Sequence, residues 1–422
     1  MASTTSADQA PEQVREKWAP VFRADARQNT AVAPAAKSAA AESFAIEWRA
    51  FAELEPIAAA WRELADRALE PNVFYAPAFA LAAAPVFGRE VGAVLVWSGT
   101  QPRQLLGLFP ARVAERRYGL KLPVLVGWTH PYAPLGTPLI EREAAEPVIA
   151  AWLAYFAADP SLPGLLLLPL IAADGAFATA LAATLQRVQM PSADFDRHRR
   201  ALLAPQGDRS GYLERTLDTR QSYNLRRNLR RSWRRLNALG AVAFTAATER
   251  SAVAQAIEDF FALEAGGWKG RAGTAALFHD DIRSFMTTAL AALAGERQVT
   301  VDRLTLDGRA IAAAIVLRSA NAAWFWKIAH DDALARYSPG VMIAAAVTEQ
   351  LLDDGEITQA DSCAGAGHPM IDRMWRERLT LCDRLIAVRP DAPFSQVRRL
   401  ETLRRVAVAT AKSIRRPLRG RR

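Results

Sequence analysis

The chain has 422 residues, 51% of them hydrophobic, so it is long enough for two to three domains with sizeable cores. Two cysteines argue against a disulfide scaffold, and five scattered histidines give no metal-ligand spacing. The net charge of +9 suggests a nucleic-acid partner at first sight, but residues 396–422 hold ten Lys or Arg and one Glu, so the remainder is neutral.

Residues 1–42 are rich in Ala, Ser, Thr, Gln and Pro and are predicted to form a mobile arm. They contain no apolar stretch of the kind that secretory signals require. Apolar runs elsewhere are too short to cross a bilayer. These features predict a cytoplasmic protein without structural metal.

Residues 43–205 are predicted to form the first domain. Apolar residues at helical spacing indicate a helix over Ala50–Ala68, and a Pro-rich break at residues 71–77 separates it from a second helix. Further elements are expected in the order strand, strand, strand, helix, strand, helix, strand, at residues 91–97, 105–113, 124–128, 143–156, 164–171, 175–187 and near 201.

Residues 206–390 are predicted to repeat this order as a second domain. Helices are expected over residues 252–265 and 280–294, followed by strands at 298–306, 310–318 and 322–330, a helix from residue 339 and a strand near 357–362. The dipeptide Asp307-Gly308 predicts a tight hairpin between the first two of these strands. The pattern favours an α/β (α+β) fold with two domains, each with a mixed, mostly antiparallel sheet flanked by helices.

An anion site is predicted where the strand over residues 322–330 leads to the turn Tyr337-Ser338-Pro339-Gly340. The Ser338 hydroxyl can cap the following helix, and Pro339 suits the first helical position, where no N–H is needed. Gly340 leaves the start of the helix without a side chain, so that a phosphate could approach its free amides. A plain helix start is the alternative, and the aromatic strand before the turn favours the anion site.

Carboxylates follow two of the predicted strands and are candidates for a general base. Asp331 comes directly after the strand before the turn, and Asp361 ends the next strand along the chain. Glu264, next to a Gly-rich break at residues 266–270, is a third candidate. For each of them, a solvated loop or a loop cap is the alternative role. Candidate substrate contacts are Trp268, Lys269 and His330.

A helix with six arginines is predicted in the link between the two halves. One face of this helix consists of Leu225, Leu229, Trp233 and Leu236, and arginines cover the rest. Arg226 and Arg230 are candidates for holding a phosphate-bearing substrate. A solvated interdomain helix is the alternative, which we favour slightly. Because no RNA- or DNA-binding motif accompanies the helix, a nucleic-acid partner is not expected.

The basic tail, residues 391–422, is predicted to form an amphipathic helix. Its apolar stripe consists of Val397, Leu400, Leu403, Ala407, Ala411 and Ile414, with Lys or Arg on the other faces. Such a helix could make peripheral contact with an anionic membrane, where each basic side chain contributes about 1 kcal/mol. A disordered tail that keeps the protein in solution is the alternative.

Several sequence blocks between Phe44 and Val388 resemble one family. They are Trp61 with residues 71–77, the arginine-rich helix, Leu263-Glu264 with residues 267–270, Leu306-Asp307-Gly308, and residues 326–331 leading to residues 337–340. With these blocks the chain is similar to acetyltransferases associated with bacterial cellulose and exopolysaccharide biosynthesis. They form a branch of the GNAT superfamily of N-acetyltransferases, have tandem domains, and are related to the Fem-type peptidoglycan aminoacyltransferases.

The resemblance implies two tandem GNAT-like domains, of which the second binds acyl-CoA and the first shapes the acceptor cleft. The diphosphate of acetyl-CoA would contact the turn from Tyr337 to Val341. The thioester would be oriented, and its oxyanion stabilised, by backbone amides of Trp326, Lys327, Ile328 and Ala329. We expect direct transfer to an amine or hydroxyl of a sugar, polysaccharide precursor or small metabolite, with Asp331 or Asp361 as the base.

Two other functions stay open. A Fem-like transferase that uses aminoacyl-tRNA would give the arginine cluster a role, and tRNA binding would distinguish it from an acetyltransferase. A non-catalytic scaffold for exopolysaccharide assembly would bind membranes through the tail but would not bind acetyl-CoA.

Overall fold

The first half of the chain alternates strands and helices much as expected. A computed structural model describes residues 44–117, 120–217 and 223–419, and the predicted arm lies outside them. The strands are β1 (Phe44–Ala50), β2 (Gly92–Ser98), β3 (Leu105–Arg117), β4 (Leu120–Gly127), β5 (Leu139–Ile140), β6 (Leu165–Ala172) and β7 (Ser192–Leu203). The helices are α2 (Ala58–Arg67), α3 (Pro77–Phe87), α4 (Ala145–Ala158) and α5 (Ala176–Arg187). The helix expected over Ala50–Ala68 begins later, because two short 3₁₀ turns follow β1.

The second half contains α6 (Tyr212–Leu217), α7 (Tyr223–Asn237), α8 (Arg250–Gly266), α9 (Trp268–Arg271), α10 (Asp280–Gly295), α11 (Pro339–Asp353) and α12 (Phe394–Arg419). Its strands are β8 (Val242–Ala247), β9 (Val299–Leu306), β10 (Arg309–Ser319), β11 (Ala322–His330), β12 (Gln359–Asp361) and β13 (Glu377–Ala387). The predicted hairpin joins β9 and β10, and both Asp307 and Gly308 have the positive φ that such a turn requires.

The two halves repeat one strand arrangement, as predicted, but each begins with a strand that was not predicted, β1 and β8. In the first half β1, β2, β3 and β4 pair antiparallel in chain order, and β6 then pairs parallel with β4. In the second half β8, β9, β10 and β11 do the same, and β12 pairs parallel with β11. The predicted fold class, a mixed and mostly antiparallel sheet flanked by helices, is confirmed.

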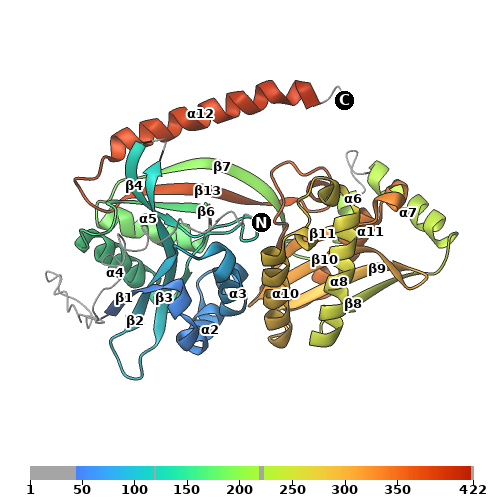
Figure 1. The fold of residues 1–422 in the computed structure, drawn as a ribbon, viewed down its shortest axis with the longest axis horizontal. Coiled ribbons are helices and arrows are strands. Elements are labelled where there is room, and N and C mark those ends of the chain that lie inside the picture. Colours follow the sequence, from blue (N-terminus) through green and yellow to red (C-terminus); the bar gives the residue numbers. More distant parts are fainter. Residues whose placement is uncertain (1–43, 118–119, 218–222, 420–422) are drawn as a thin grey trace, which may run out of the picture.

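The last strand of each half pairs with the other half (Figure 1). β13, which the sequence analysis did not identify, lies between β6 and β7, and β7 in turn pairs with β12. Within the described residues all thirteen strands therefore belong to one sheet, in the order β1-β2-β3-β4-β6-β13-β7-β12-β11-β10-β9-β8, with β5 beside β3. The domain boundary between residues 205 and 206 stays a prediction. β7 and β13 each pair with strands on the other side of this boundary.

One hydrophobic core is shared by both halves. It includes Phe79 of α3, Phe285 of α10 and Trp324 of β11, and the rings of Phe79 and Phe285 are 5.4 Å apart. A second core lies under α11, and a third lies under α4 and α5. Because α3 packs on α10 through aromatic side chains, the boundary between the halves is a built interface rather than a flexible link.

The tail helix α12 is attached to the body at its beginning and passes over β7 and β13 (Figure 1). The helix is confirmed, but its predicted apolar stripe is not continuous, because Val397 faces the body and is fully buried. Leu403 and Val406 are 66% and 60% exposed. The side chains of Ala411 and Ile414 lie outside the described part. In the described ranges, no helix is both long and apolar enough to span a membrane.

Candidate active site

Strands β11 and β12 separate soon after they meet. They pair in parallel only over three residues, Ala322 to Trp324 opposite Gln359 to Asp361. β11 continues to His330, with β10 on its other side. Among the described strands, none pairs with the β12-facing edge of β11 beyond Trp324. The backbone groups on that edge are therefore available to an extended ligand.

A β-bulge turns two side chains of β11 toward the first half of the chain. The register with β10 shifts between Ile315 and Val316, opposite Trp326. The Trp326 indole Nε1 donates to the carbonyl of Tyr132 at 2.8 Å, and Lys327 Nζ lies 4.1 Å from the centre of the Tyr132 ring. Bulges often re-aim side chains beside functional sites, and here the bulge brings a loop of the first half against the open edge of β11.

Lys327 is the cation of this site without a carboxylate of its own. No hydrogen bond or ion pair of its ammonium is found in the part of the chain that the structure describes. Burial, and secondarily the charge of Lys269, lower the pKa of Lys327 to about 8. The same surroundings disfavour the charged form of the His130 imidazole. Burial and the charge of Lys327 lower the pKa of His130 to about 3. Lys327 is thus mostly charged at neutral pH, with a minor neutral fraction that an unperturbed lysine would not have.

The carboxylate of Asp361, a predicted base, is buried and fully engaged. One oxygen forms a short ion pair with Arg200 of β7, whose guanidinium also donates to the Pro134 carbonyl at 3.0 Å. The other oxygen accepts from the Cys363 amide at 3.0 Å. The pair ties β12 to a strand and a loop of the first half. Arg200 was not identified from the sequence, since nothing local marks it.

The other two candidate bases also have partners on both oxygens. Glu264 accepts from Lys269 Nζ at 2.6 Å and from the Ala276 amide at 2.8 Å. Asp331 pairs with Arg309 at 2.9 Å and caps the 3₁₀ turn that follows it. These contacts position the loops around β11, and the role of the three carboxylates as bases stays a prediction.

The turn before α11 differs from its predicted geometry. The helix begins at Pro339 as expected, but Ser338 is left-handed, with φ 55° and ψ 48°, and its hydroxyl makes no capping bond. Its carbonyl accepts from the Val341 amide instead. Gly340 is buried, and a Cβ there would lie 3.2 Å from Nδ1 of His330. The imidazole therefore occupies the space beside Gly340, and the role of this turn in anion binding stays a prediction.

Positive charge nevertheless gathers at this turn. The guanidinium groups of Arg235, from α7, and of Arg336 lie 5.3 and 4.8 Å from the centre of the buried Tyr337 ring. Both arginines are exposed. Together with the positive end of α11 they can attract an anionic group to the loop between β11 and α11.

The remaining predicted substrate contacts are spread over the second half. Trp268 is 61% exposed, and His330 lies 3.5 Å from Asp332. Arg230 is exposed on α7, whereas the side chain of Arg226 lies outside the described part. The structure brings Lys269 close to β11 through Glu264, but it does not bring α7 to the open edge.

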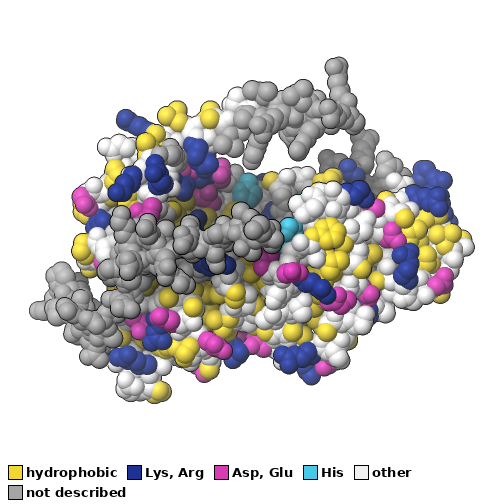
Figure 2. Space-filling view, viewed as in Figure 1, with side chains coloured by type: hydrophobic (Ala, Val, Ile, Leu, Met, Phe, Trp, Pro, Cys, Tyr) yellow, Lys and Arg dark blue, Asp and Glu magenta, His cyan; other side chains and the backbone are white. Residues whose placement is uncertain are grey.

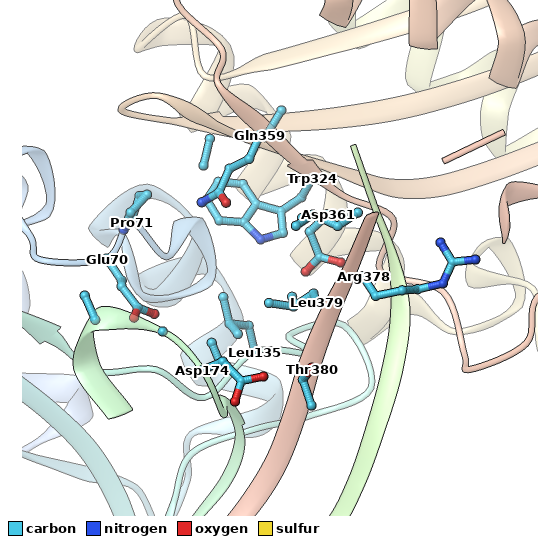
Figure 3. Close-up of a pocket in the computed structure, with 16 residues that line it drawn as sticks. Glu70, Pro71, Leu135, Asp174, Trp324, Gln359, Asp361, Arg378, Leu379 and Thr380 are labelled. Atoms are coloured by element: carbon cyan, nitrogen blue, oxygen red, sulfur yellow. The ribbon is translucent and has the colours of Figure 1, made fainter. Parts of the chain in front are cut away.

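Two cavities flank the region. One, of about 350 Å³, lies at the start of β11 and is lined from both halves, with Glu70, Asp174 and Trp324 among its residues (Figure 3). The other, of about 510 Å³, is a groove beside α7. It is lined by Arg230 and by apolar side chains, among them Trp233. Figure 2 shows Lys and Arg side chains over this end of the molecule beside hydrophobic ones. Among the residues described, no cluster of His, Cys, Asp and Glu could hold a metal ion.

Comparison with known proteins identifies the domain that carries β11 and α11. Residues 224–368 match the profile of a family described as Acetyltransferase (GNAT) domain. This stretch is therefore similar to GNAT acetyltransferase domains, a likeness that indicates acyltransferase activity and an acyl-CoA co-substrate. No curated protein matches the chain.

Of three solved structures that align with most of the chain, FemX has a TM-score high enough to indicate a shared fold. FemX aligns over 81% of this chain and 98% of its own, with a TM-score of 0.52 and 9% identity. A conserved protein of unknown function from Bacteroides thetaiotaomicron aligns over 81% and 99%, with a TM-score of 0.49 and 11% identity. A tandem GNAT protein from the clavulanic acid biosynthesis pathway aligns over 82% and 99%, with a TM-score of 0.40 and 12% identity. At this identity the likeness to FemX concerns the fold alone.

Proposed function

We propose that the protein transfers an acyl group, acetyl by default, from acyl-CoA directly to an amine or hydroxyl acceptor. The observation that carries this proposal is the open edge of β11 beyond Trp324, within the stretch that is similar to GNAT domains. The amides of the pantetheine arm would pair with this edge like an added strand. Backbone amides between Trp326 and Ala329 would orient the thioester and stabilise the developing oxyanion.

The phosphates of CoA would lie at the start of α11. Arg235 and Arg336 supply charge there, and the helix adds the positive end of its dipole. Gly340 does not form the contact surface, because His330 covers it. The exposed arginines rather than a bare glycine would therefore give most of the anion affinity.

Lys327 would accept the proton that the acceptor loses. The nucleophile forms a bond to the thioester carbon, the C–S bond breaks, and the CoA thiolate takes up a proton. A lysine with a pKa of about 8 is partly neutral near neutral pH, so it can act as a base. The three candidate carboxylates, in contrast, already pair with cationic side chains.

A thiol-release assay with acetyl-CoA tests the proposal. A panel of amino sugars, amines and hydroxyl compounds serves as acceptors, and calorimetric titration measures acetyl-CoA binding separately. We expect acetyl-CoA to bind without an acceptor and thiol release to require one. Absence of acetyl-CoA binding would refute the proposal.

A second candidate is a Fem-like transferase that uses aminoacyl-tRNA. The exposed arginines of α7 beside the stacked rings of Trp233 and Phe244, 5.7 Å apart, favour it, since such surfaces can hold nucleic acid. Titration with tRNA in place of acetyl-CoA separates the two functions.

We further propose that the reaction belongs to exopolysaccharide or cellulose biosynthesis, in the cytoplasm at an anionic membrane surface. The resemblance of the sequence blocks supports the pathway, and the outward Leu403 and Val406 on a basic helix support the membrane contact. A non-catalytic scaffold would be favoured if the protein bound anionic vesicles but not acetyl-CoA.

A further inference from the structure

The cavity at the start of β11 contains a carboxylate without a cation. Glu70 accepts from the Phe177 amide at 2.8 Å and thereby caps α5. A Cβ on Gly175 would collide with this carboxylate, so glycine is needed for its approach. No ion pair of Glu70 exists among the described residues. Burial raises the pKa of Glu70, as expected for a carboxylate without a positive partner.

The other two carboxylates that line the cavity already have cationic partners. Asp361 pairs with Arg200, and the more exposed Asp174 pairs with Arg197 at 2.5 Å. Arg378 directs its guanidinium away from Glu70 and Asp174 (Figure 3) and donates to backbone carbonyls, including that of Trp375 at 2.6 Å. Among the described residues, Glu70 is therefore the carboxylate of the cavity without a cationic partner, and Arg378 is a cation without an acidic one.

A hydrogen-bond donor also faces the cavity without a partner among the described residues. Trp324 is only 2% exposed, and its indole nitrogen has no hydrogen-bond partner in the described part of the chain. The nitrogen lies on the side of the ring that faces Asp361 and Leu135, both of which line the cavity (Figure 3). The N–H is therefore available to an acceptor atom that enters the cavity.

We propose that this cavity binds a small molecule with an ammonium group, which pairs with Glu70, and an oxygen that accepts from Trp324 Nε1–H. Amino sugars and amino alcohols have this chemistry. The wall of the cavity comes from both halves of the chain, so the site exists only in the assembled protein.

The inference rests on the proposed function in one respect, because it makes the cavity the anchor of the acceptor. Trp324 precedes Trp326 by two residues, about 7 Å along a strand. An acceptor anchored at Glu70 would reach the open edge of β11 only if its far end extends by about this distance beyond the Trp324 N–H. An ammonium held by a carboxylate has no free electron pair, so a second group, a hydroxyl or another amine, would be the nucleophile.

Calorimetric titration of the full chain at neutral pH tests the site. The probes are two amines with neutral counterparts, glucosamine with glucose and 2-aminoethanol with ethylene glycol. We expect each amine to bind at least tenfold more tightly than its counterpart. Glu70→Gln should weaken amine binding at least tenfold, because it removes a charge-assisted bond while its amide oxygen still caps α5.

Two further variants make the test specific. Trp324→Phe should weaken amine binding about threefold to tenfold by removing the donor alone. Glu143→Gln, which removes an exposed carboxylate outside the cavity, should leave binding unchanged. Failure of both amines to bind, or unchanged amine binding by Glu70→Gln, would overturn the proposal.

The orientation has its own probe, 2-methoxyethylamine, which has an amine and an ether oxygen but no second nucleophile. It should bind and compete with 2-aminoethanol, and thiol release in its presence should stay at the background rate. Thiol release above background would overturn the anchoring role of the amine.

Titration with acetyl-CoA distinguishes failure of the two proposals. Amine binding without acetyl-CoA binding refutes only the proposed function, and acetyl-CoA binding without amine binding refutes only the amine site in the cavity.

Discussion

At the scale of single residues, Lys327 is the group whose protonation should control the rate. Below about pH 8 the amine is charged and cannot accept a proton, so kcat/KM should rise with pH and level off above that value. Lys327→Met should remove this rise and lower kcat/KM about 100-fold or more. The measurement is a pH–rate profile with acetyl-CoA. An unchanged profile in Lys327→Met would exclude the lysine as base.

The neighbouring lysine provides a matched variant. The charge of Lys269 lowers the pKa of Lys327, and Glu264 raises it. Lys269→Met should therefore move the inflection of the profile to higher pH.

Lys327→Met should also raise the midpoint of thermal unfolding at neutral pH. The pKa of Lys327 in the folded state lies below its ordinary value, so its charged form is disfavoured in the folded state.

The two arginines beside Tyr337 carry the prediction about phosphate binding. Arg336→Gln and Arg235→Gln should each weaken acetyl-CoA binding about threefold to tenfold, an effect that diminishes with added salt because both side chains are exposed. Arg271→Gln is the control, since its guanidinium pairs with Asp332 at 2.7 Å. Equal losses in all three variants would argue against a localised phosphate site.

Expectations about single residues were confirmed where they followed from a rule of local sequence. They missed features that depend on contacts between residues distant in the sequence. Pro339 begins α11, as expected, because its fixed φ suits the first helical position. The left-handed conformation of Ser338 and the imidazole beside Gly340 were not predicted, and the second depends on how His330 packs, which no local rule contains. The ion pair between Arg200 and Asp361 likewise joins residues 161 positions apart.

At the scale of elements, α12 combines attachment and exposure. Glu401 is buried and pairs with Arg117 at 2.9 Å, and Arg405 reaches Asp383 at 2.9 Å. These residues face the body, whereas Leu403 and Val406 face away from it. The helix can therefore stay docked while presenting an apolar, basic surface outward.

Removal of residues 408–422 should abolish most binding to anionic vesicles and leave the docked part of α12 in place. The truncation deletes six basic residues, each worth about 1 kcal/mol near anionic headgroups, so the loss should exceed 100-fold. Vesicle sedimentation with phosphatidylglycerol measures it, with phosphatidylcholine as the control. The pair Leu403→Ser and Val406→Ser tests the apolar part at constant charge. Equal binding to both lipids would contradict the proposal.

Long periodic elements were predictable and short or exchanged strands were not. α8, α10, β9, β10 and β11 have regular apolar spacing and lie close to their predicted bounds. β13 is buried between two strands that belong to distant parts of the sequence, so its place in the sheet follows from tertiary pairing alone. The open edge of β11 could not be predicted either, since it depends on the residue at which β12 separates from β11.

At the scale of the whole molecule, the exchanged strands make each half depend on the other. β13 pairs with both β6 and β7, and β12 pairs with the other edge of β7, so a fragment of residues 44–206 would leave three strand edges unpaired. Unpaired edges promote aggregation. We expect this fragment to aggregate when it is produced alone, as measured by size-exclusion chromatography and circular dichroism.

The register of β13 suggests how to rescue that fragment. Glu377 at the start of β13 lies opposite Leu202 near the end of β7, so a short Gly/Ser linker can join residue 206 to residues 374–393. The fusion should be largely monomeric and show cooperative unfolding. Its control carries Leu381→Asp and Leu385→Asp, which place charges at buried positions of β13 and should not rescue. Both proteins expose the same face of α3, so any difference between them reports on β13. A monomeric, cooperatively folded fragment without β13 would show that the first half does not need the exchanged strand.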